Sequence, residues 1–358
     1  MNPITRRKSR GLYLGGVKVG GGAPISIQSM TNTKTADVVG TLAQISRLAA
    51  AGCDICRLAV PDMESADVLD AIIKESRLPI VADIHFDYRL ALRSIEQGVC
   101  GLRLNPGNIG GELRVKQVAA AAKVYGIPIR VGVNGGSLEK DVLAKYGGIT
   151  PQALTESALR HVMLLEKEGF YDIKISLKSS DINVMLDAYR LIAEECDYPL
   201  HIGLTEAGPA RRGTVKSAVA MGILLAEGIG DTMRVSLTGD PVEEVFVALE
   251  ILNALSIRPA LFDIISCPSC GRTEIDLEQL VQFVEDGLRG LQTDKPLKIA
   301  VMGCPVNGPG EARNADFGIA GGKGEGVLFA KGEIIAKYPQ EELADKLIEK
   351  VKQSLQGQ

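Results

Sequence analysis

The feature that most limits the possible folds is an alternation of strand-like and helix-like segments, repeated eight times between residues 24 and 255. Short apolar runs rich in β-forming residues are each followed by a segment with helical periodicity. Eight such units predict an α/β protein with a (β/α)8 TIM barrel. The alternative is an open doubly wound sheet, which normally has fewer units. The predicted strands are residues 24–30, 54–60, 78–85, 101–105, 127–134, 172–178, 199–205 and 232–238. The clearest helical segments are residues 37–51, 64–76, 111–125, 151–168, 182–195 and 241–255.

The residues after Arg258 depart from this rhythm and predict a second, smaller α/β domain. Two strand-like runs, Leu261–Ile265 and Leu297–Val301, flank a helical segment and each leads into a cysteine-bearing loop. A glycine-rich stretch, a hairpin-like segment over residues 327–335 and a final helix follow. We therefore expect a barrel domain over residues 1–258 and a metal-binding domain over residues 259–358.

Composition excludes several classes of protein. The chain has 358 residues, 46% of them hydrophobic, which is ample for a large core. A net charge of −4 offers no basic field for nucleic acid or an anionic membrane. No apolar run reaches the roughly 20 residues that span a bilayer. The basic patch at Arg6–Lys8 lacks the apolar segment of a signal peptide, and seven cysteines do not suggest a disulfide framework. We expect a cytoplasmic protein with no nucleic-acid or membrane partner.

Three cysteines and one glutamate form the most specific chemical motif. Cys267 and Cys270 lie in one turn-rich loop, and Cys304 lies in another, with Glu311 seven residues further on. Three thiolates with no histidine nearby suit the iron of an iron–sulfur cluster and leave one iron for a different ligand. The alternatives are a structural zinc site, which is usually closed by four cysteine or histidine ligands, and buried inert thiols.

A second Cys-x2-Cys pair, Cys53 and Cys56, has a different setting. It leads from a helix end into a predicted strand without turn residues between the thiols. Residues three apart in a strand point to opposite faces, so both thiols cannot readily reach one metal ion. We interpret this pair as core thiols, and Cys100 and Cys196 likewise, because neither has a partner at a suitable spacing.

Polar residues recur at alternate positions of the predicted barrel strands and therefore share one face. They are Arg57, Asp83, His85, Arg103, Asn105, Arg130, Asn134, Lys174, Ser176, Lys178, His201, Thr205, Arg234, Ser236 and Thr238. A barrel interior is normally filled with branched apolar side chains. Four inward arginines would repel one another unless they surround a multiply charged anion at the C-terminal mouth, and a small diphosphate matches their fork geometry. The alternative is that they pair with inward acids or point into solvent.

The histidines and one glutamate are less decisive. His85 and His201 fit either ligand binding or a satisfied core position, and His161, within a helical pattern, fits a structural role. Glu206 ends the seventh predicted strand, where nearby positive charge favours its ionised form. It suits either proton transfer or simple charge balance.

Six segments together resemble the 4-hydroxy-3-methylbut-2-enyl diphosphate synthases of the methylerythritol phosphate route to isoprenoids. The resemblance runs from about Thr5 to beyond Glu311, and its motifs are long and specific. The segments are Gln28–Thr33, Val81–Arg89, Leu102–Gly110, Ile129–Asn134, Gly203–Gly208 and Cys304–Glu311.

The resemblance implies a TIM barrel followed directly by a 4Fe–4S domain, with the cluster held by Cys267, Cys270, Cys304 and Glu311. It implies that Arg57, Arg103, Arg130, Lys178 and Arg234 grip a diphosphate, that His85, Asn105, Asn134 and Ser236 line the same pocket, and that Glu206 is the catalytic acidic residue. It also implies a homodimer in which the cluster domain of one subunit caps the barrel of the other.

The implied reaction is a reductive dehydration with ring opening. The substrate would be 2-C-methyl-D-erythritol 2,4-cyclodiphosphate and the product (E)-4-hydroxy-3-methylbut-2-enyl diphosphate, with two electrons delivered singly through the cluster. No nicotinamide fingerprint is present. Since the sequence also shows no flavin motif and no second cluster motif, an external carrier, flavodoxin or ferredoxin, is the expected donor. Two other functions remain open from the residues: a zinc lyase or hydrolase using the same pocket, and a cluster-bearing sensor or scaffold without turnover.

Overall fold

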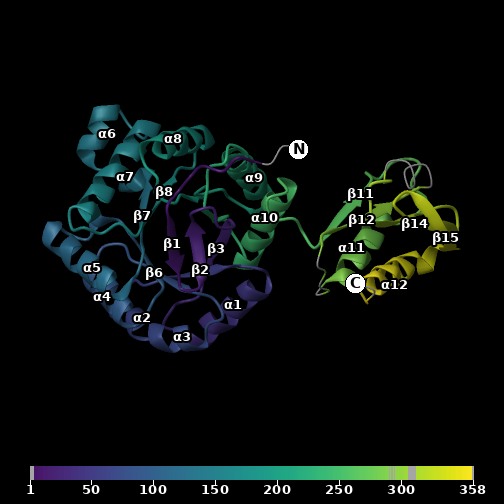
Figure 1. Ribbon diagram of the computed structural model, residues 1–358, viewed down its shortest axis with the longest axis horizontal. Coiled ribbons are helices and arrows are strands. Elements are labelled where there is room, and N and C mark those ends of the chain that lie inside the picture. Colours follow the sequence, from purple (N-terminus) through teal and green to yellow (C-terminus); the bar gives the residue numbers. More distant parts are fainter. Residues whose placement is uncertain (1–3, 290, 292, 294, 305–311, 357–358) are drawn as a thin grey trace. The chain divides into compact units, whose positions relative to one another are not determined.

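The computed structural model describes residues 4–289, 291, 293, 295–304 and 312–356 (Figure 1). The chain divides into two compact units, Met1–Leu255 and Ser256–Gln358. The boundary expected from the sequence, at Arg258, lies just beyond this division.

The first unit contains a barrel of parallel strands. Eight strands are hydrogen-bonded side by side in the order β8-β7-β6-β5-β4-β3-β10-β9. A parallel bridge between Ile175 in β8 and Leu200, just before β9, joins the two edge strands and closes the ring. The predicted TIM barrel is therefore confirmed, and the open sheet is excluded. The strands are β3 (Ser26–Met30), β4 (Ile55–Ala59), β5 (Ile80–Asp83), β6 (Gly101–Leu104), β7 (Ile129–Asn134), β8 (Ile173–Lys178), β9 (His201–Ile202) and β10 (Thr232–Met233).

Helices surround this barrel because each connection between parallel strands needs a crossover that covers the sheet (Figure 1). The segment predicted as one helix over residues 64–76 is two helices, which meet at Val68. The helices are α1 (Val38–Ala50), α2 (Met63–Asp67), α3 (Leu69–Glu75), α4 (Tyr88–Glu96), α5 (Glu112–Tyr125), α6 (Lys140–Tyr146), α7 (Pro151–Glu166), α8 (Ile182–Glu195), α9 (Ala210–Ala226) and α10 (Pro241–Ala254). Two single-turn 3-10 helices, η1 (Pro106–Asn108) and η2 (Gly135–Ser137), follow β6 and β7.

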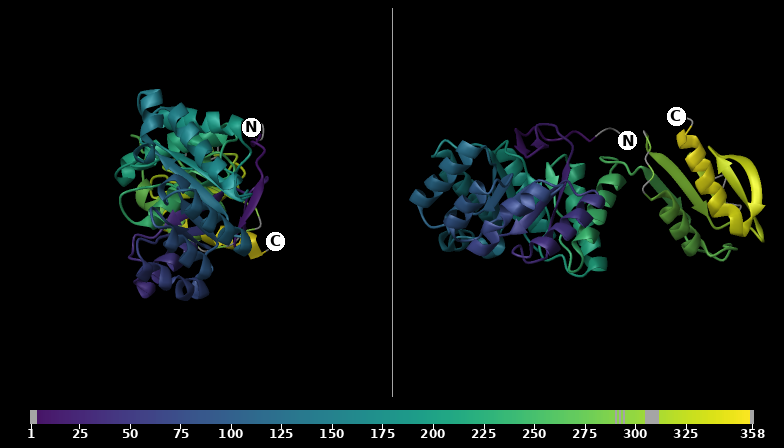
Figure 2. Two further views of the ribbon diagram at one scale, coloured as in Figure 1. Left: turned by 90° about the vertical axis from the view of Figure 1, so that its left-hand side faces the viewer. Right: turned by 90° about the horizontal axis from the view of Figure 1, so that it is seen from below.

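An N-terminal hairpin, which the sequence analysis does not include, lies across one end of the barrel (Figure 2). It pairs β1 (Gly11–Leu14) with β2 (Val17–Gly20) in antiparallel register. Leu14 and its neighbours on the same face are buried against Ile55 and Val81, which are near the starts of β4 and β5. The hairpin therefore covers the N-terminal ends of the barrel strands.

The second unit is a five-stranded mixed sheet in the order β11-β12-β13-β14-β15. The first three strands are parallel and the last two are antiparallel to their neighbours. Leucine and valine side chains from α11 and α12 form a core with leucine, isoleucine and valine side chains on one face of this sheet. The glycine-rich stretch, Gly318–Gly326, contains most of β13 and the start of β14. The elements are β11 (Phe262–Ser266), α11 (Leu277–Leu288), β12 (Leu297–Met302), β13 (Phe317–Ala320), β14 (Glu325–Ala330), β15 (Glu333–Pro339), η3 (Gln340–Glu342) and α12 (Leu343–Gln356).

In the part of the chain that the structure describes, no helix combines the length and the apolar character needed to cross a membrane.

Candidate active site and metal-binding loops

A belt of charged side chains crosses the barrel interior. In the strand register Arg103 of β6 stands opposite Asp83 of β5 on one side and Arg130 of β7 on the other, and Arg130 stands opposite Lys174 of β8. Arg57, Arg130 and Lys174 are buried. These arginines therefore do not point into solvent, which was one of the alternatives that the sequence left open.

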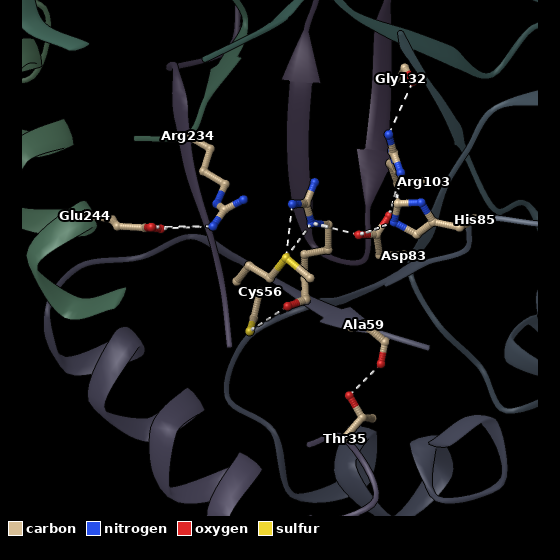
Figure 3. A network of polar contacts seen from close by, with 11 residues as sticks. Thr35, Cys56, Ala59, Asp83, His85, Arg103, Gly132, Arg234 and Glu244 are labelled. Carbon is tan, nitrogen blue, oxygen red and sulfur yellow. Dashed lines mark hydrogen bonds and ion pairs between the residues drawn. The ribbon is translucent and has the colours of Figure 1, made fainter. Parts of the chain in front are cut away.

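Asp83 is the acid at the centre of this belt. Its Oδ1 accepts a hydrogen bond of 3.1 Å from Nη1 of Arg103, and its Oδ2 lies 3.8 Å from Nε of Arg57 and 3.6 Å from Nε2 of His85 (Figure 3). Burial opposes ionisation, but Arg57, the hydrogen bond with His85 and the charges of Arg103 and Arg130 together hold the pKa of Asp83 well below its usual range. The ionised carboxylate therefore offsets part of the surrounding positive charge.

Arg234 has a carboxylate partner from a helix. Its Nη2 lies 3.3 Å from Oε2 of Glu244, a buried residue in the first turn of α10. Glu244 is not among the residues expected from the sequence, although its position carries a signal: it shares the buried face of an amphipathic helix with Ala248 and Ile251. The alternative in which arginines pair with inward acids is thus realised in part, for Arg57, Arg103 and Arg234.

Other cations in the belt have no such partner. Nε and Nη1 of Arg130 and Nζ of Lys174 are buried without a hydrogen-bond partner in the described part of the chain. Burial, then repulsion by neighbouring cations, lowers the pKa values of Arg130, Lys174 and Lys178 well below their ordinary values. Burial also lowers the pKa of Arg57, to about 10. Uncompensated buried cations are costly, so the belt is suited to an anion with several charges.

His201 lies in the same interior. It is fully buried in β9, and neither ring nitrogen has a hydrogen-bond partner among the described residues. Burial, and after it the charges of Arg130, Lys178 and Lys174, lower its pKa well below the ordinary histidine value. The ring is therefore neutral at physiological pH.

A cavity of about 480 Å³ opens where β5, β6 and β7 end. Four of the site residues expected from the sequence line this cavity, together with residues of the loops that follow these strands. Asn105 is buried there, and both polar atoms of its side chain lack a hydrogen-bond partner within the described chain. Unsatisfied polar atoms of this kind are the usual sign of a binding partner. The lining residues are His85, Phe86, Arg103, Asn105, Asn108, Gly132, Asn134, Gly136, Ser137 and Leu138.

Glu206 and Ser236 lie outside this lining set. Glu206 is exposed, and its backbone has a φ of 54°, one of the three positive values among the described non-glycine residues. Such left-handed backbone costs energy in a residue with a side chain and is concentrated at functional sites. Ser236 is half-buried, two residues beyond Arg234. Both residues follow the C-terminal ends of barrel strands, β9 and β10.

His161 holds two loops near the pocket. It is buried on α7, its Nε2 is 3.1 Å from Oε1 of Glu139, and a Cβ placed on Gly107 would lie 2.3 Å from the same nitrogen. Gly107 belongs to the loop after β6 and Glu139 to the loop after β7. These contacts agree with the structural role expected for His161.

The two cysteine loops of the second unit meet at one edge of its sheet. Ser266 and Val301 are paired at the ends of the parallel strands β11 and β12, so Cys267 and Cys304 follow adjacent strand ends. The backbone N–H of Gly303 donates a hydrogen bond of 3.2 Å to Sγ of Cys267. The pKa of the Cys270 thiol is lowered by hydrogen bonds from the backbone and side chain of Arg272.

Among the described residues, no three His, Cys, Asp or Glu side chains form a group able to hold a metal ion. The proposed fourth ligand, Glu311, lies outside the described residues. The donor set nevertheless fits an iron–sulfur cluster: the thiols come from two adjoining loops, and an N–H group already donates to a sulfur, as happens around such clusters.

The remaining thiols have the character of core residues. Cys53 and Cys56 are buried, and burial raises the pKa of Cys53 to about 11 and that of Cys56 further. Cys100 and Cys196 are half-buried, and burial raises their pKa values as well. High thiol pKa values disfavour the thiolate that binds metals.

Comparison with known proteins gives matches over both units. The GcpE TIM-barrel domain matches residues 9–249, and the GcpE protein C-terminal domain matches residues 263–353. A 4-hydroxy-3-methylbut-2-en-1-yl diphosphate synthase (flavodoxin) of Maridesulfovibrio salexigens is 60% identical over 339 residues, 95% of this chain and 94% of that protein. Proteins with the same name from Geobacter sulfurreducens and Clostridium acetobutylicum are each 57% identical, and each alignment covers 99% of the relative and 98% or 97% of this chain.

A solved structure shows the same barrel fold in a distant protein. Dihydropteroate synthase from Xanthomonas albilineans, in complex with 7,8-dihydropteroate, is 17% identical, with a TM-score of 0.51 over 69% of this chain and 99% of that chain. That likeness concerns the fold alone. The two domain matches and the high identity of the relatives, by contrast, extend over nearly the whole sequence, and the chain therefore belongs to the GcpE family.

Proposed function

We propose that this protein is a 4-hydroxy-3-methylbut-2-enyl diphosphate synthase. It would convert 2-C-methyl-D-erythritol 2,4-cyclodiphosphate to (E)-4-hydroxy-3-methylbut-2-enyl diphosphate, with two electrons entering, the ring opening at a carbon–oxygen bond and the tertiary hydroxyl leaving as water. The observation that carries the proposal is the belt of buried cations in the barrel interior, because it exceeds the charge of Asp83 and Glu244 and suits a diphosphate. The name shared by the relatives supports the same reaction.

The binding roles follow from the charges and contacts. Arg57, Arg103, Arg130, Lys178 and Arg234 would hold the diphosphate, with guanidinium groups matching phosphate oxygens in pairs. His85, Asn105, Asn134 and Ser236 would donate or accept hydrogen bonds along the rest of the substrate. Arg57, Asn105 and Arg130 are buried, and the exclusion of water around them strengthens their electrostatic contacts with the substrate.

The cysteine loops would hold a 4Fe–4S cluster. Cys267, Cys270 and Cys304 are the proposed thiolate ligands and Glu311 the proposed fourth ligand. When bound, the cluster would supply electrons one at a time, which a substrate without a hydride acceptor requires. The hydrogen bond from Gly303 to Cys267 stabilises negative charge on that sulfur.

Glu206 is the proposed proton-transfer residue. The left-handed backbone at this position supports the assignment, since such strain is kept where function needs a side chain in one place. Glu206→Gln should keep diphosphate binding and iron content but lose at least about 100-fold in turnover, the usual contribution of a general acid or base. Near-normal turnover of the variant would refute the assignment.

The proposed partners are a reduced flavodoxin or ferredoxin and a second copy of the chain. The word flavodoxin in the relatives' names supports the donor. The family resemblance supports a cytoplasmic homodimer in which the site is shared between subunits. Mixing inactive Glu206→Gln and Cys304→Ser subunits tests the sharing: activity should return in the mixed dimer, and two chains with self-contained sites would give none.

The decisive experiment combines iron and sulfide analysis of anaerobically purified protein with turnover of the cyclodiphosphate by a reduced carrier. The protein should be brown, contain inorganic sulfide and form the linear diphosphate. A colourless protein containing zinc would favour the redox-inert lyase or hydrolase instead. A brown protein that binds but never converts the cyclodiphosphate would favour a sensor.

A further inference from the structure

Glu244, although it lies on a helix outside the barrel, contacts the segment after β10 that carries Arg234 and Ser236. Its side chain is buried in the first turn of α10, where the helix dipole favours a carboxylate. Oε1 accepts a 3.1 Å hydrogen bond from the backbone N–H of Leu237, and Oε2 accepts a 3.2 Å bond from the hydroxyl of Ser29. Both oxygens also lie within 3.4 Å of Nη2 of Arg234 (Figure 3).

The segment that Glu244 holds is irregular backbone. Strand β10 ends at Met233, so Arg234 and Ser236 lie beyond the hydrogen-bonded part of the strand. Three backbone N–H groups fix this segment: Arg234 to the carbonyl of Ile202, Leu237 to Glu244, and Thr238 to the carbonyl of Gly208. Among the described residues, the bond to Glu244 is the one of these three that a side chain accepts, and it adjoins Ser236 directly.

Glu244 leaves most of the Arg234 guanidinium available. The ion pair engages Nη2, while Nε of Arg234 is buried and has no hydrogen-bond partner among the described residues. A buried ion pair is weak support for stability, because desolvation offsets most of the attraction. Orientation of the guanidinium is therefore the clearer gain from burying this carboxylate.

We infer that Glu244 is a positioning residue that fixes both Arg234 and Ser236 for binding a phosphate group. This rests on the proposed function, in which the pocket takes a diphosphate. Glu244 acts through these residues and needs no contact with the substrate. If Glu244 positions Arg234, removing its charge should weaken diphosphate binding. If Glu244 only neutralises the positive charge of the pocket, removing its charge should strengthen diphosphate binding.

Glu244→Gln is the sharpest change, because it keeps the size of the side chain and an acceptor for Leu237. Its amide N–H groups replace an acceptor next to Nη2 of Arg234, so two donors meet and the guanidinium must move. The probe is inorganic diphosphate, titrated calorimetrically into the full-length protein. Losing one hydrogen bond to a charged group predicts binding weaker by about 10- to 100-fold. The matched control is Glu243→Gln, an exposed residue of the same helical turn, which should bind within about twofold of wild type.

A double-mutant cycle separates positioning from a general effect on the fold. In an Arg234→Met background, Glu244→Gln should change diphosphate binding by less than about threefold, because coupled residues are not additive. With the cyclodiphosphate, Glu244→Gln should raise KM more than it lowers kcat. An undiminished loss in the Arg234→Met background, or tighter binding by Glu244→Gln alone, would overturn the inference.

Two further measurements keep the result decisive. If Glu244→Gln does not fold, Ser29→Ala takes its place: it removes one donor from the same carboxylate and must weaken diphosphate binding at least about twofold, and unchanged binding contradicts the inference. Wild-type protein that fails to bind diphosphate at all contradicts the proposed function instead.

Discussion

Among single residues, Lys174 shows most clearly how the barrel interior departs from an ordinary core. Its side chain is 1% exposed, and its amino group has no hydrogen-bond partner within the described chain. Burial, followed by the charges of Arg130 and Arg57, lowers its pKa well below that of a free lysine. Such a residue destabilises the empty protein, and the anion that we propose for this interior would offset part of that cost.

Lys174→Met should therefore stabilise the protein. Replacing buried charged groups by apolar ones of similar volume is often stabilising, by about 1–4 kcal/mol. Denaturant unfolding measures the change, and Lys116→Met, at an exposed lysine of α5, serves as the control with an expected effect within about 0.5 kcal/mol. A destabilised Lys174→Met protein would mean that this amino group has a partner in the folded state.

Lys178 predicts a pH dependence of binding. Its pKa is lowered by burial first and by Arg234, Arg130, Arg57 and Arg103 next. Between this lowered pKa and the ordinary lysine value, the unfolded chain holds a proton that the empty folded pocket does not, so this group reduces stability as pH falls through that window. A bound diphosphate raises the pKa again, and binding should take up protons.

Calorimetric titration in two buffers of different ionisation enthalpy measures that uptake. Wild type should take up protons with inorganic diphosphate, and its affinity should fall as pH rises through the lysine pKa of the complex. The Lys178→Met variant should take up fewer protons. Comparing the two proteins also corrects for protons that diphosphate itself takes up or releases. Equal uptake by the two proteins would show that Lys178 is charged before the ligand arrives.

Among single residues, the sequence predicted the positively charged side chains of the barrel more completely than the carboxylates that pair with them. Alternation along strands is a local property, so Arg57, Arg103 and Arg130 could be assigned to one face from sequence. The contact between Arg234 and Glu244 joins a strand end to the next helix, and its geometry depends on the tertiary fold. The catalytic and binding roles of these residues remain predictions.

Among secondary-structure elements, the packing of the Arg103 side chain of β6 over β7 depends on one glycine. A Cβ on Gly132 would lie 2.7 Å from Nε of Arg103 and 3.3 Å from Oγ of Ser176. Arg103 also donates a 3.3 Å hydrogen bond to the Gly132 carbonyl. Close passage of the Arg103 side chain over β7 therefore requires the absence of a side chain there.

Gly132→Ala should impair binding more than folding. The added methyl pushes aside the flexible end of Arg103 and weakens its bond to Asp83, so diphosphate affinity should fall by about tenfold or more, with at most about 1–3 kcal/mol lost in unfolding free energy. Gly222→Ala in α9, where a Cβ meets nothing within 4 Å, should bind normally. Unimpaired binding by Gly132→Ala would mean that Arg103 does not need this path.

The elements themselves were largely predictable because apolar periodicity and turn residues act locally. The hairpin of β1 and β2 was missed, although Leu12 and Leu14 alternate with exposed residues before the Gly15–Gly16 turn. Its strands are four residues each and are stabilised by the barrel strands they cover, which short-range patterns do not report. The break at Val68 likewise reflects packing, because no residue there is a strong helix breaker.

On the scale of the whole molecule, the proposed binding site and the proposed cluster site belong to different units. The cationic belt belongs to Met1–Leu255, and the cysteine loops belong to Ser256–Gln358. Each unit has its own apolar core. A change in the cysteine loops should therefore leave the chemistry of the barrel interior intact.

Cys304→Ser tests this separation. The variant should lose iron and sulfide, because the hydroxyl of serine is a poor ligand for iron in these clusters, and it should lose turnover. Its affinity for inorganic diphosphate should stay within about twofold of wild type, because every charge of the cationic belt belongs to the first unit. A large loss of diphosphate affinity would show that the cysteine loops contribute to the anion site.

The hairpin β1–β2 has a consequence for how a molecule reaches the barrel interior. Leu12, Leu14 and Val19 close the end at which the strands begin, while the cavity opens where β5, β6 and β7 finish. In the described part of the barrel, a small molecule would therefore enter and leave at the end where these strands finish. Product release and the entry of water would then depend on the same loops, those that follow β5, β6 and β7.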